Sequence, residues 1–295
     1  MSEHSERFTS LRPLLFTIAY EILGTATESD DVLQESYLRW AEVDLERVTD
    51  TKAYLAQLVT RQSLNALRQS SRRREEYVGP WLPEPLLIDA GADASADVVL
   101  AESVSMAMMV VLETLTPDER AVFVLREVFG FSHDEIASAI GKSTAAVRQM
   151  AHRAREHVQA RRKRFTPVDP QESAELTTRF FAAAAGGDLQ ALVSMLAPDV
   201  VWTADSDGKV SAARRPVSGA VNVARLIVGL IRLGGEAGRV QPAVFNNTPA
   251  LLTYLGDELA GVVVMEFTDG LVSNFYAMRN PAKLGTVLVP RQIGR

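Results

Sequence analysis

Residues 131 to 150, "FSHDEIASAIGKSTAAVRQM", constrain the fold of this chain more than any other stretch. Ser132 can cap a helix, and Glu135 completes a capping box with it. Gly141 supplies the left-handed backbone conformation that a tight turn needs. Ser143 can then cap a second helix, and apolar residues recur at helical spacing in both segments. The stretch therefore predicts two helices joined by a tight turn, a helix-turn-helix.

Charge along the second of these helices is one-sided. Although the whole chain has a net charge of −6, eight basic residues and a single acid, Glu156, lie between Lys142 and Arg164. Such a basic cluster indicates a face that meets phosphates; the alternative is an ordinary helical hairpin with a solvated charged face. The second helix of a helix-turn-helix enters the major groove, where Arg148 suits guanine and Gln149 suits adenine. The predicted DNA contacts of this helix are Ser143, Thr144, Arg148, Gln149, His152, Arg153 and Arg155.

Composition excludes several classes of protein. At 295 residues the chain is too long for one ordinary core, and 47% hydrophobic with 23% charged residues is typical of a soluble globular protein. No apolar run approaches the ~20 residues of a membrane span, and the polar N-terminus does not resemble a signal peptide. Because there is no cysteine and there are only four histidines, we expect no disulfide, no metal site and no cofactor. We therefore expect a cytoplasmic protein without a membrane partner.

Helical and strand-like segments divide the chain into predicted domains. Residues 8 to 75 and 97 to 164 show helical spacing, with Gly24 ending the first helix and Thr116 capping a later one. Further along, a helical stretch over residues 172 to 200 precedes short β-rich runs and one more helix. The predicted domains are residues 1 to 76, a Pro-rich linker from 77 to 96, residues 97 to 165, and residues 166 to 295.

Two parts of the chain carry a family resemblance. "DDVLQESYLRW" followed by "AYLAQLVTRQSLNALRQSSRRR" resembles region 2 of bacterial group IV (extracytoplasmic-function) sigma factors. "LTPDERAVFVLREVFGFSHDEIASAIGKSTAAVRQMAHRARE" resembles their region 4. The resemblance covers residues 8 to 160 and leaves no room for a full region 3. It implies that region 4 binds the −35 promoter element, and that region 2 binds core RNA polymerase and the −10 element.

The resemblance also implies roles for residues of region 2. The clamp helices of the largest polymerase subunit would contact Asp31, Gln34, Glu35, Leu38 and Arg39. The −10 element would contact Lys52, Arg61, Asn65 and Arg68. The last three share one helical face by their spacing, on which Asn65 can read a base edge while the arginines suit phosphates. The alternative for both sets is a solvated helix face without a ligand.

Residues 171 to 285 resemble the SnoaL-like domains of the cone-shaped nuclear-transport-factor superfamily, which a subgroup of these sigma factors carries after region 4. The subgroup's "WLPEP" linker motif is intact at residues 81 to 85, whereas its "DGGGKV" and "NPDKL" motifs are "DSDGKV" and "NPAKL" here. The predicted interdomain regulatory residues are Trp81, Leu82, Pro83, Asp205, Asp207, Lys209, Asn280 and Lys283. Isomerases of the superfamily use an Asp base, but this domain has no histidine and neither Asp205 nor Asp207 has an evident partner base. We therefore expect no catalytic residue, and a small-molecule ligand in the cone is left open.

The linker raises a question of its own. "GPWLPEPLL" is apolar, and Pro83 and Pro85 keep it extended and non-helical. If Trp81, Leu82 and Leu86 were exposed, the linker would be a sticky surface, so it calls for a docking surface on another domain. We expect the cone to supply that surface; the alternative is that Trp81 packs on region 2.

These features predict a multidomain protein: two all-α DNA- and polymerase-binding domains, the second a helix-turn-helix, followed by an α+β cone-shaped SnoaL-like domain. The predicted function is that of a sigma factor, not an enzyme, whose appended cone controls its binding to core RNA polymerase and promoter DNA. The alternative is a stand-alone helix-turn-helix regulator with a ligand-sensing or enzymatic cone. Co-purification with core polymerase distinguishes the two.

Overall fold

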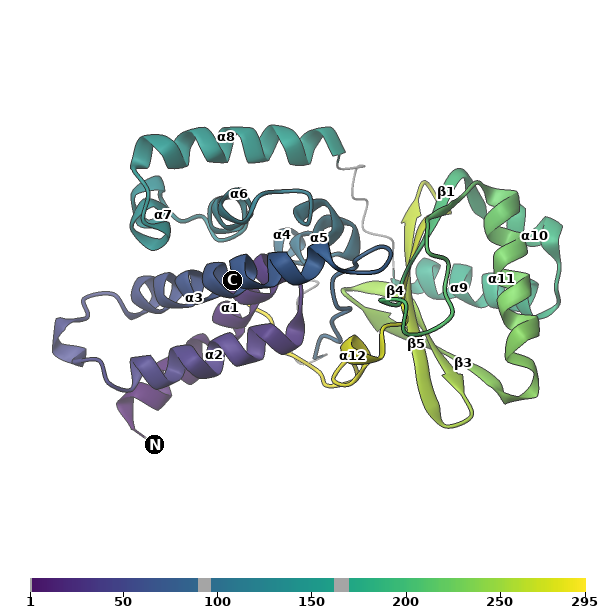
Figure 1. Cartoon of the computed structure of the whole chain (residues 1–295), viewed down its shortest axis with the longest axis horizontal. Coiled ribbons are helices and arrows are strands. Elements are labelled where there is room, and N and C mark those ends of the chain that lie inside the picture. Colours follow the sequence, from purple (N-terminus) through teal and green to yellow (C-terminus); the bar gives the residue numbers. More distant parts are fainter. Residues whose placement is uncertain (1, 90–96, 162–169) are drawn as a thin grey trace. The chain divides into compact units, whose positions relative to one another are not determined.

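The computed structural model describes residues 2 to 89, 97 to 161 and 170 to 295 (Figure 1). Internal contacts divide the chain into two units. The helical unit comprises Met1–Glu76, Ile88–Arg162 and Val289–Arg295, and the sheet unit comprises Tyr77–Leu87 and Lys163–Leu288. The first part of the linker thus belongs to the sheet unit, and the last residues of the chain belong to the helical unit. The predicted boundary between residues 165 and 166 lies outside the described residues.

The first helical domain is built from α1 (Glu3–Leu23), α2 (Ala26–Trp40), the short 3-10 helix η1 (Leu45–Arg47) and α3 (Thr51–Glu75). Gly24 ends α1 with a φ of 78°, a left-handed conformation that glycine adopts without steric strain. The three long helices pack on one another and bury a common core that includes Leu15, Ile18, Leu33, Leu55 and Val59. Their outward faces are left for other contacts.

The second helical domain contains α4 (Val98–Ser103), α5 (Met106–Leu112), α6 (Pro117–Phe123), the π-helix η2 (Val124–Val128), α7 (His133–Ile140) and α8 (Thr144–Arg161). Thr116 caps α6 as predicted and forms a capping box with Glu119. The apolar stretch before α6 forms two short helices, α4 and α5, and not one. Ser105 is the N-cap of α5, and its hydroxyl accepts a hydrogen bond from the Met108 amide. A serine that bonds the backbone in this way competes with continuation of the preceding helix.

The sheet unit begins with α9 (Pro170–Ala185), α10 (Leu189–Ser194), β1 (Leu196–Asp205) and β2 (Val217–Ser218). It continues with α11 (Ala220–Gly234), η3 (Gly235–Ala237), β3 (Gly238–Phe245), β4 (Thr248–Leu255), β5 (Glu258–Thr268), β6 (Leu271–Met278) and α12 (Pro281–Leu284). Among the described residues the strands form one sheet in the order β2-β1-β6-β5-β4-β3. β1 runs parallel to β6, and the other neighbours are antiparallel.

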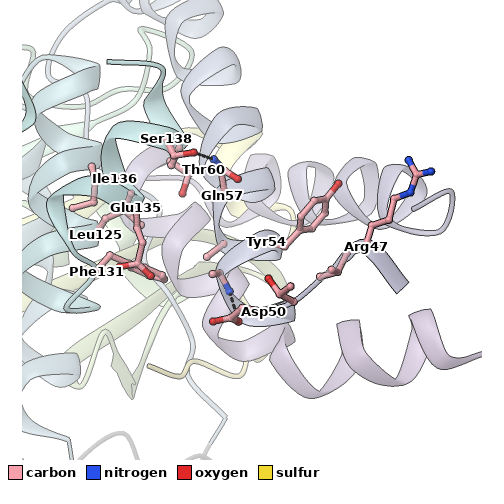
Figure 2. Close-up of a pocket in the computed structure, with 15 residues that line it drawn as sticks. Arg47, Asp50, Tyr54, Gln57, Thr60, Leu125, Phe131, Glu135, Ile136 and Ser138 are labelled. Carbon is pink, nitrogen blue, oxygen red and sulfur yellow. Dashed lines mark hydrogen bonds between the residues drawn. The ribbon is translucent and has the colours of Figure 1, made fainter. Parts of the chain in front are cut away.

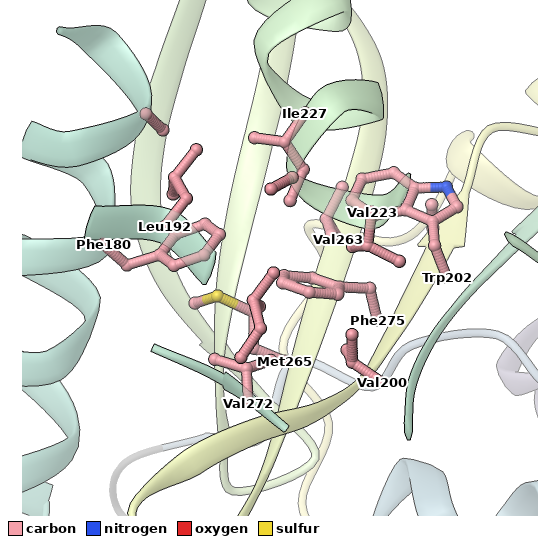
Figure 3. Packing of buried hydrophobic residues seen from close by; sticks show 14 of the residues in the cluster. Phe180, Leu192, Val200, Trp202, Val223, Ile227, Val263, Met265, Val272 and Phe275 are labelled. Atoms are coloured by element: carbon pink, nitrogen blue, oxygen red, sulfur yellow. The ribbon is translucent and has the colours of Figure 1, made fainter. Parts of the chain in front are cut away.

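One face of this sheet packs against helices over a hydrophobic cluster (Figure 3). Phe180 of α9 and Trp202 of β1 both pack on Phe275 of β6, with ring centroids 5.6 and 5.1 Å apart. Ile227 of α11 joins the same cluster. Because side chains alternate along a strand, the neighbouring residues of β1, β5 and β6 point to the other face of the sheet.

The predicted helix over residues 172 to 200 was wrong at its end. α10 stops at Ser194, and Leu196 already belongs to β1. Val200, Trp202 and Ala204 are buried in the cluster at a spacing of two, so pairing with β6 and burial outweigh the local helical pattern. No helix in the described part of the chain has both the length and the hydropathy of a membrane span.

Candidate nucleic-acid interface and linker site

The helix-turn-helix forms with the predicted local geometry. Ser132 and Glu135 make a capping box, and Gly141 turns the chain with a φ of 68°. The Ser143 hydroxyl accepts a hydrogen bond of 3.3 Å from the Ala146 amide at the start of α8. Val147 and Met150 are buried, whereas Arg148 and Gln149, which lie between them in α8, are exposed to solvent.

Other predicted DNA-contacting residues of α8 are held by acids of the same domain. The Thr144 hydroxyl donates to Asp134 at 2.6 Å. Arg153 lies 3.3 Å from Glu119, and His152 lies 3.5 Å from Glu156. Arg155 pairs with Glu127 at 2.6 Å, and this hydrogen bond raises the pKa of the guanidinium. By contrast, Arg148 is exposed and makes no ion pair within the described residues, so its guanidinium is available to DNA.

The predicted −10 face of α3 lies against the helix-turn-helix. The Arg61 guanidinium donates to the carbonyls of Ser138 and Ala139, at 2.7 and 3.0 Å. The Gln57 amide donates to the Ser138 hydroxyl at 2.6 Å. These carbonyls belong to the C-terminal turn of α7, where backbone acceptors lack helical partners and the helix dipole favours a cation. In this arrangement Arg61 binds protein at a position predicted to meet DNA.

A second contact of the same kind lies nearby. Arg68 pairs with Asp118 of α6 at 2.6 Å, and Lys142 lies 3.3 Å from the same carboxylate. Partial burial alone would raise the pKa of Asp118, but the two cations outweigh it and hold the pKa below its usual value. All four predicted −10 residues, Lys52, Arg61, Asn65 and Arg68, have exposed side chains. The DNA-binding roles of the four residues stay predictions. In this structure the side chains of Arg61 and Arg68 are bound by the second helical domain.

A cavity of about 270 Å³ lies between the loop before α3, α3 itself and α7 (Figure 2). Tyr54, Gln57 and Thr60 line it from α3, and Phe131 and Glu135 line it from the second helical domain. The buried Thr60 hydroxyl has no hydrogen-bond partner among the described residues. Aromatic, amide and hydroxyl groups in one cavity suit an unpaired base, which stacks on rings and bonds through its edges.

The predicted polymerase-binding residues share one exposed face of α2. They are Asp31, Gln34, Glu35, Leu38 and Arg39. Leu38 is 62% exposed although it is a large apolar residue, and Arg39 pairs with Glu35 at 2.6 Å beside it. The opposite side of the helix buries Leu33 and Trp40 in the first helical domain. An exposed leucine amid charged residues is a suitable centre for a protein contact.

The linker segment, Tyr77–Leu87, is held by Asp205 at the end of β1. One Asp205 carboxylate oxygen accepts hydrogen bonds from the Leu82 amide and from Lys283 Nζ, both at 2.8 Å. The other accepts from the Tyr77 hydroxyl. Burial, together with this hydrogen bond to the carboxylate, raises the pKa of Tyr77. Asp205 thus has three donors in a fully buried position.

Lys283 completes the linker site from α12. Its ammonium also donates to the Leu82 carbonyl at 2.6 Å and lies 3.2 Å from the centroid of the Trp81 ring. Asn280 donates to the Tyr77 hydroxyl at 2.7 Å. The buried ion pair is therefore satisfied by hydrogen bonds and by a cation–π contact, as a buried pair must be.

The far end of the linker segment is fastened separately. The Leu86 amide donates to the Asn246 side chain at 2.7 Å, and the Asn246 amide donates to the Leu86 carbonyl at 2.8 Å. Leu82, Pro83 and Leu86 are buried, so the sheet unit supplies the docking surface that the apolar linker called for. At the rim, Asp207 pairs with Lys209 at 2.8 Å, and this hydrogen bond lowers the pKa of the carboxyl.

The structure thus brings together most of the residues that the motifs singled out. Trp81, Leu82, Asp205, Asn280 and Lys283 converge on one site, whereas Asp207 and Lys209 lie at its edge. Two participants were missed. Tyr77 lies only four residues before the "WLPEP" motif, but Asn246 carries no signal beyond its place in a hairpin turn, where its φ is 52°.

Two family models match the helical parts of the chain: "Sigma-70 region 2" over residues 7–73 and "Sigma-70, region 4" over residues 105–158. The ECF RNA polymerase sigma factor SigJ of Mycobacterium tuberculosis is 38% identical, over 94% of this chain and 91% of its own. The probable ECF RNA polymerase sigma factor SigI of the same species is 28% identical, over 96% of this chain and 97% of its own.

The fold is also that of a solved relative. The crystal structure of SigJ from Mycobacterium tuberculosis matches with a TM-score of 0.75 and 36% identity, covering 94% of this chain and 97% of that one. The predicted fold class is confirmed: two all-α domains, the second a helix-turn-helix, precede an α+β cone-shaped SnoaL-like domain. The similarity runs through the linker and the cone and is not confined to the two helical domains.

Proposed function

We infer that this chain, which belongs to the family of extracytoplasmic-function (ECF) RNA polymerase sigma factors, directs core RNA polymerase to promoters. The observation that carries the inference is the pair of exposed faces on its helical domains. α2 presents Leu38 within a charged surface, and α8 presents Arg148 and Gln149 from a helix-turn-helix. The first suits the clamp helices of the polymerase, and the second suits the −35 element. A regulator that only bound duplex DNA would not need the exposed face of α2.

The sheet unit acts as a built-in regulator through the linker. Region 2 and region 4 are joined by the linker, so holding Leu82 and Leu86 on the sheet unit limits the path that the chain can take between them. Asp205 and Lys283 grip both the amide and the carbonyl of Leu82. Release of this grip would lengthen the free chain between the two promoter-binding domains.

A matched pair of leucines tests the polymerase contact. Leu38 and Leu255 are 62% and 58% exposed, and only Leu38 lies on the proposed polymerase face. We expect Leu38→Glu to lose co-purification with core polymerase and run-off transcription, and Leu255→Glu to retain both. Equal binding of core polymerase by the two variants would show that α2 is not the contact. High-affinity promoter binding without core polymerase would instead favour a stand-alone regulator.

A further inference from the structure

The last residues of the chain, Val289–Arg295, leave the sheet unit and pack on the helical unit; we call them the tail. Ile293 is buried, and the Gly294 amide donates to the Thr17 hydroxyl of α1 at 3.1 Å. The backbone of Gly294 lies so close to α1 that an added Cβ would be 3.1 Å from the Cβ of Pro13. A larger residue would not fit at this point without movement, so the tail is a fitted element of the helical unit.

Arg291 fastens the tail to the first helical domain. Its guanidinium donates twice to one carboxylate oxygen of Asp30 on α2, at 3.1 and 2.9 Å, and the side chain is only 10% exposed. The Arg291 carbonyl accepts from the Asp89 amide at 2.9 Å, and its backbone bridges to Ile88. The tail therefore pairs with the chain immediately after the linker segment.

Arg295 fastens the other end of the tail to the second helical domain. Its guanidinium lies 3.0 Å from Asp97 and makes a longer contact of 3.5 Å to the Val128 carbonyl. Asp97 is the N-cap of α4, whose carboxylate accepts from the Leu100 amide, so its position is set by the fold of that domain. Five residues of chain thus join α2 of the first helical domain to α4 and η2 of the second.

We propose that the tail is an autoinhibitory latch that keeps the two helical domains together, with Arg61 and Arg68 of the −10 face bonded to the second helical domain. In the arrangement that it fastens, Arg61 is bonded to α7 and Arg68 to Asp118. Both arginines are exposed, but DNA phosphates can replace their present partners only when the second helical domain moves away, and that movement separates Asp30 from Asp97. The contact of Arg291 or of Arg295 must then break.

The latch also borders the polymerase face. Gln34, one of the residues of that face, lines a cavity of about 830 Å³ together with Arg291 and Gln292 of the tail. A partner that docks on α2 therefore approaches the Arg291–Asp30 pair from the side. Core polymerase is therefore the trigger for release, a step that rests on the proposed function, whereas the latch itself is a property of the free chain.

Two labels on the free chain test the latch. Because the natural sequence has no cysteine, Gln69→Cys on α3 and Glu156→Cys on α8, both exposed positions, can be labelled for single-molecule energy transfer. We expect Arg291→Ala with Arg295→Ala to raise the ratio of open to closed molecules by roughly tenfold or more, as loss of charge-assisted hydrogen bonds implies. Arg215→Ala, an exposed arginine of the sheet unit, should leave the ratio unchanged. Arg291→Lys, which keeps the charge but loses the two-pronged geometry, should fall between.

The latch is overturned if the tail variants show the wild-type distribution. It is also overturned if they open only together with loss of helical circular dichroism, because the tail is then a structural strap. The measurement uses the full chain without polymerase or DNA, so a failure of the sigma-factor assignment would leave its outcome unaffected. With core polymerase added, a sigma factor with a latch should show further opening in the wild type and little in the tail variants.

Discussion

Replacing Asp205 with asparagine should detach the linker segment from the sheet unit while leaving β1 in place. The carboxylate accepts hydrogen bonds from the Leu82 amide, from Lys283 and from the Tyr77 hydroxyl, and its side chain is 0% exposed. Asparagine has the same shape but no charge. It would place a neutral amide, in place of the carboxylate, against the ammonium of Lys283, whose side chain is 5% exposed.

The size of the effect follows from the burial of the pair. Removing one partner of a buried ion pair costs about 3 to 5 kcal/mol, because the other charge stays in a poorly solvated place. That is roughly a 100-fold or greater loss in the ratio of docked to undocked linker. Asp205→Asn combined with Lys283→Met removes both charges, and replacing a whole buried pair by an apolar group is often nearly neutral. The double variant should therefore regain most of the loss.

Amide hydrogen exchange measures this directly. The Leu82 and Leu86 amides are both bonded to side chains of the sheet unit, so their protection reports docking of the linker segment. In Asp205→Asn we expect protection at Leu82 to fall roughly 100-fold or more, and protection in β5 to stay as it is. If exchange at Leu82 is unchanged, burial of the apolar side chains alone holds the linker, and the ion pair is not its clamp.

Three further predictions concern other parts of the chain. Burial raises the pKa of Glu21 from 4.5 to about 8, against the opposing effects of Ser103 and Arg120, so the folded chain holds a proton that the unfolded chain releases. The free energy of unfolding of the helical unit should therefore fall as pH rises from about 4.5 to about 8 and level off above, and Glu21→Gln should flatten that slope in urea titrations. Asn246→Ala leaves the buried Leu86 amide without its acceptor and puts alanine at a φ of 52°, so it should lower stability by about 2 kcal/mol in urea unfolding; an unchanged midpoint would contradict this. Arg148→Ala should weaken promoter binding by about 1 to 3 kcal/mol and relax one base preference, seen by comparing single-base promoter variants; a uniform loss across them would mean that the side chain meets phosphate.

Local signals in the sequence were sufficient for the helix-turn-helix. The N-cap at Thr116, the capping box at Ser132 and the turn at Gly141 depend on residues only a few positions apart, and all three formed as predicted. The helical stretch that ended at residue 200 was wrong because the pairing of β1 with β6 involves residues more than 70 positions away. Helical spacing within the stretch contains no trace of that pairing.

The candidate sites show the same limit. The motifs identified most residues of the linker site. Asn246 of that site and Arg291 of the tail were missed, because their partners lie far away along the chain. Spacing placed Arg61 and Arg68 on one face of α3, yet it could not say what would face them. A guanidinium binds carbonyls and carboxylates as well as phosphates, and the structure shows the first two.

A buried ion pair is weak evidence for stability, so its presence at the linker site needs another reason. We infer that the ion pair fixes the register of the linker segment against Asp205 and Lys283. Asp205 accepts from the Leu82 amide and Lys283 donates to the Leu82 carbonyl, so one residue is gripped on both sides of its backbone. If the linker slipped so that Pro83 met Asp205, the carboxylate would face a residue without an N–H and would lose a donor in a fully buried place. The prolines of "WLPEP" therefore do more than stiffen the chain: they leave the Leu82 amide as the donor that fits, and this fixes how much linker remains free between the two promoter-binding domains.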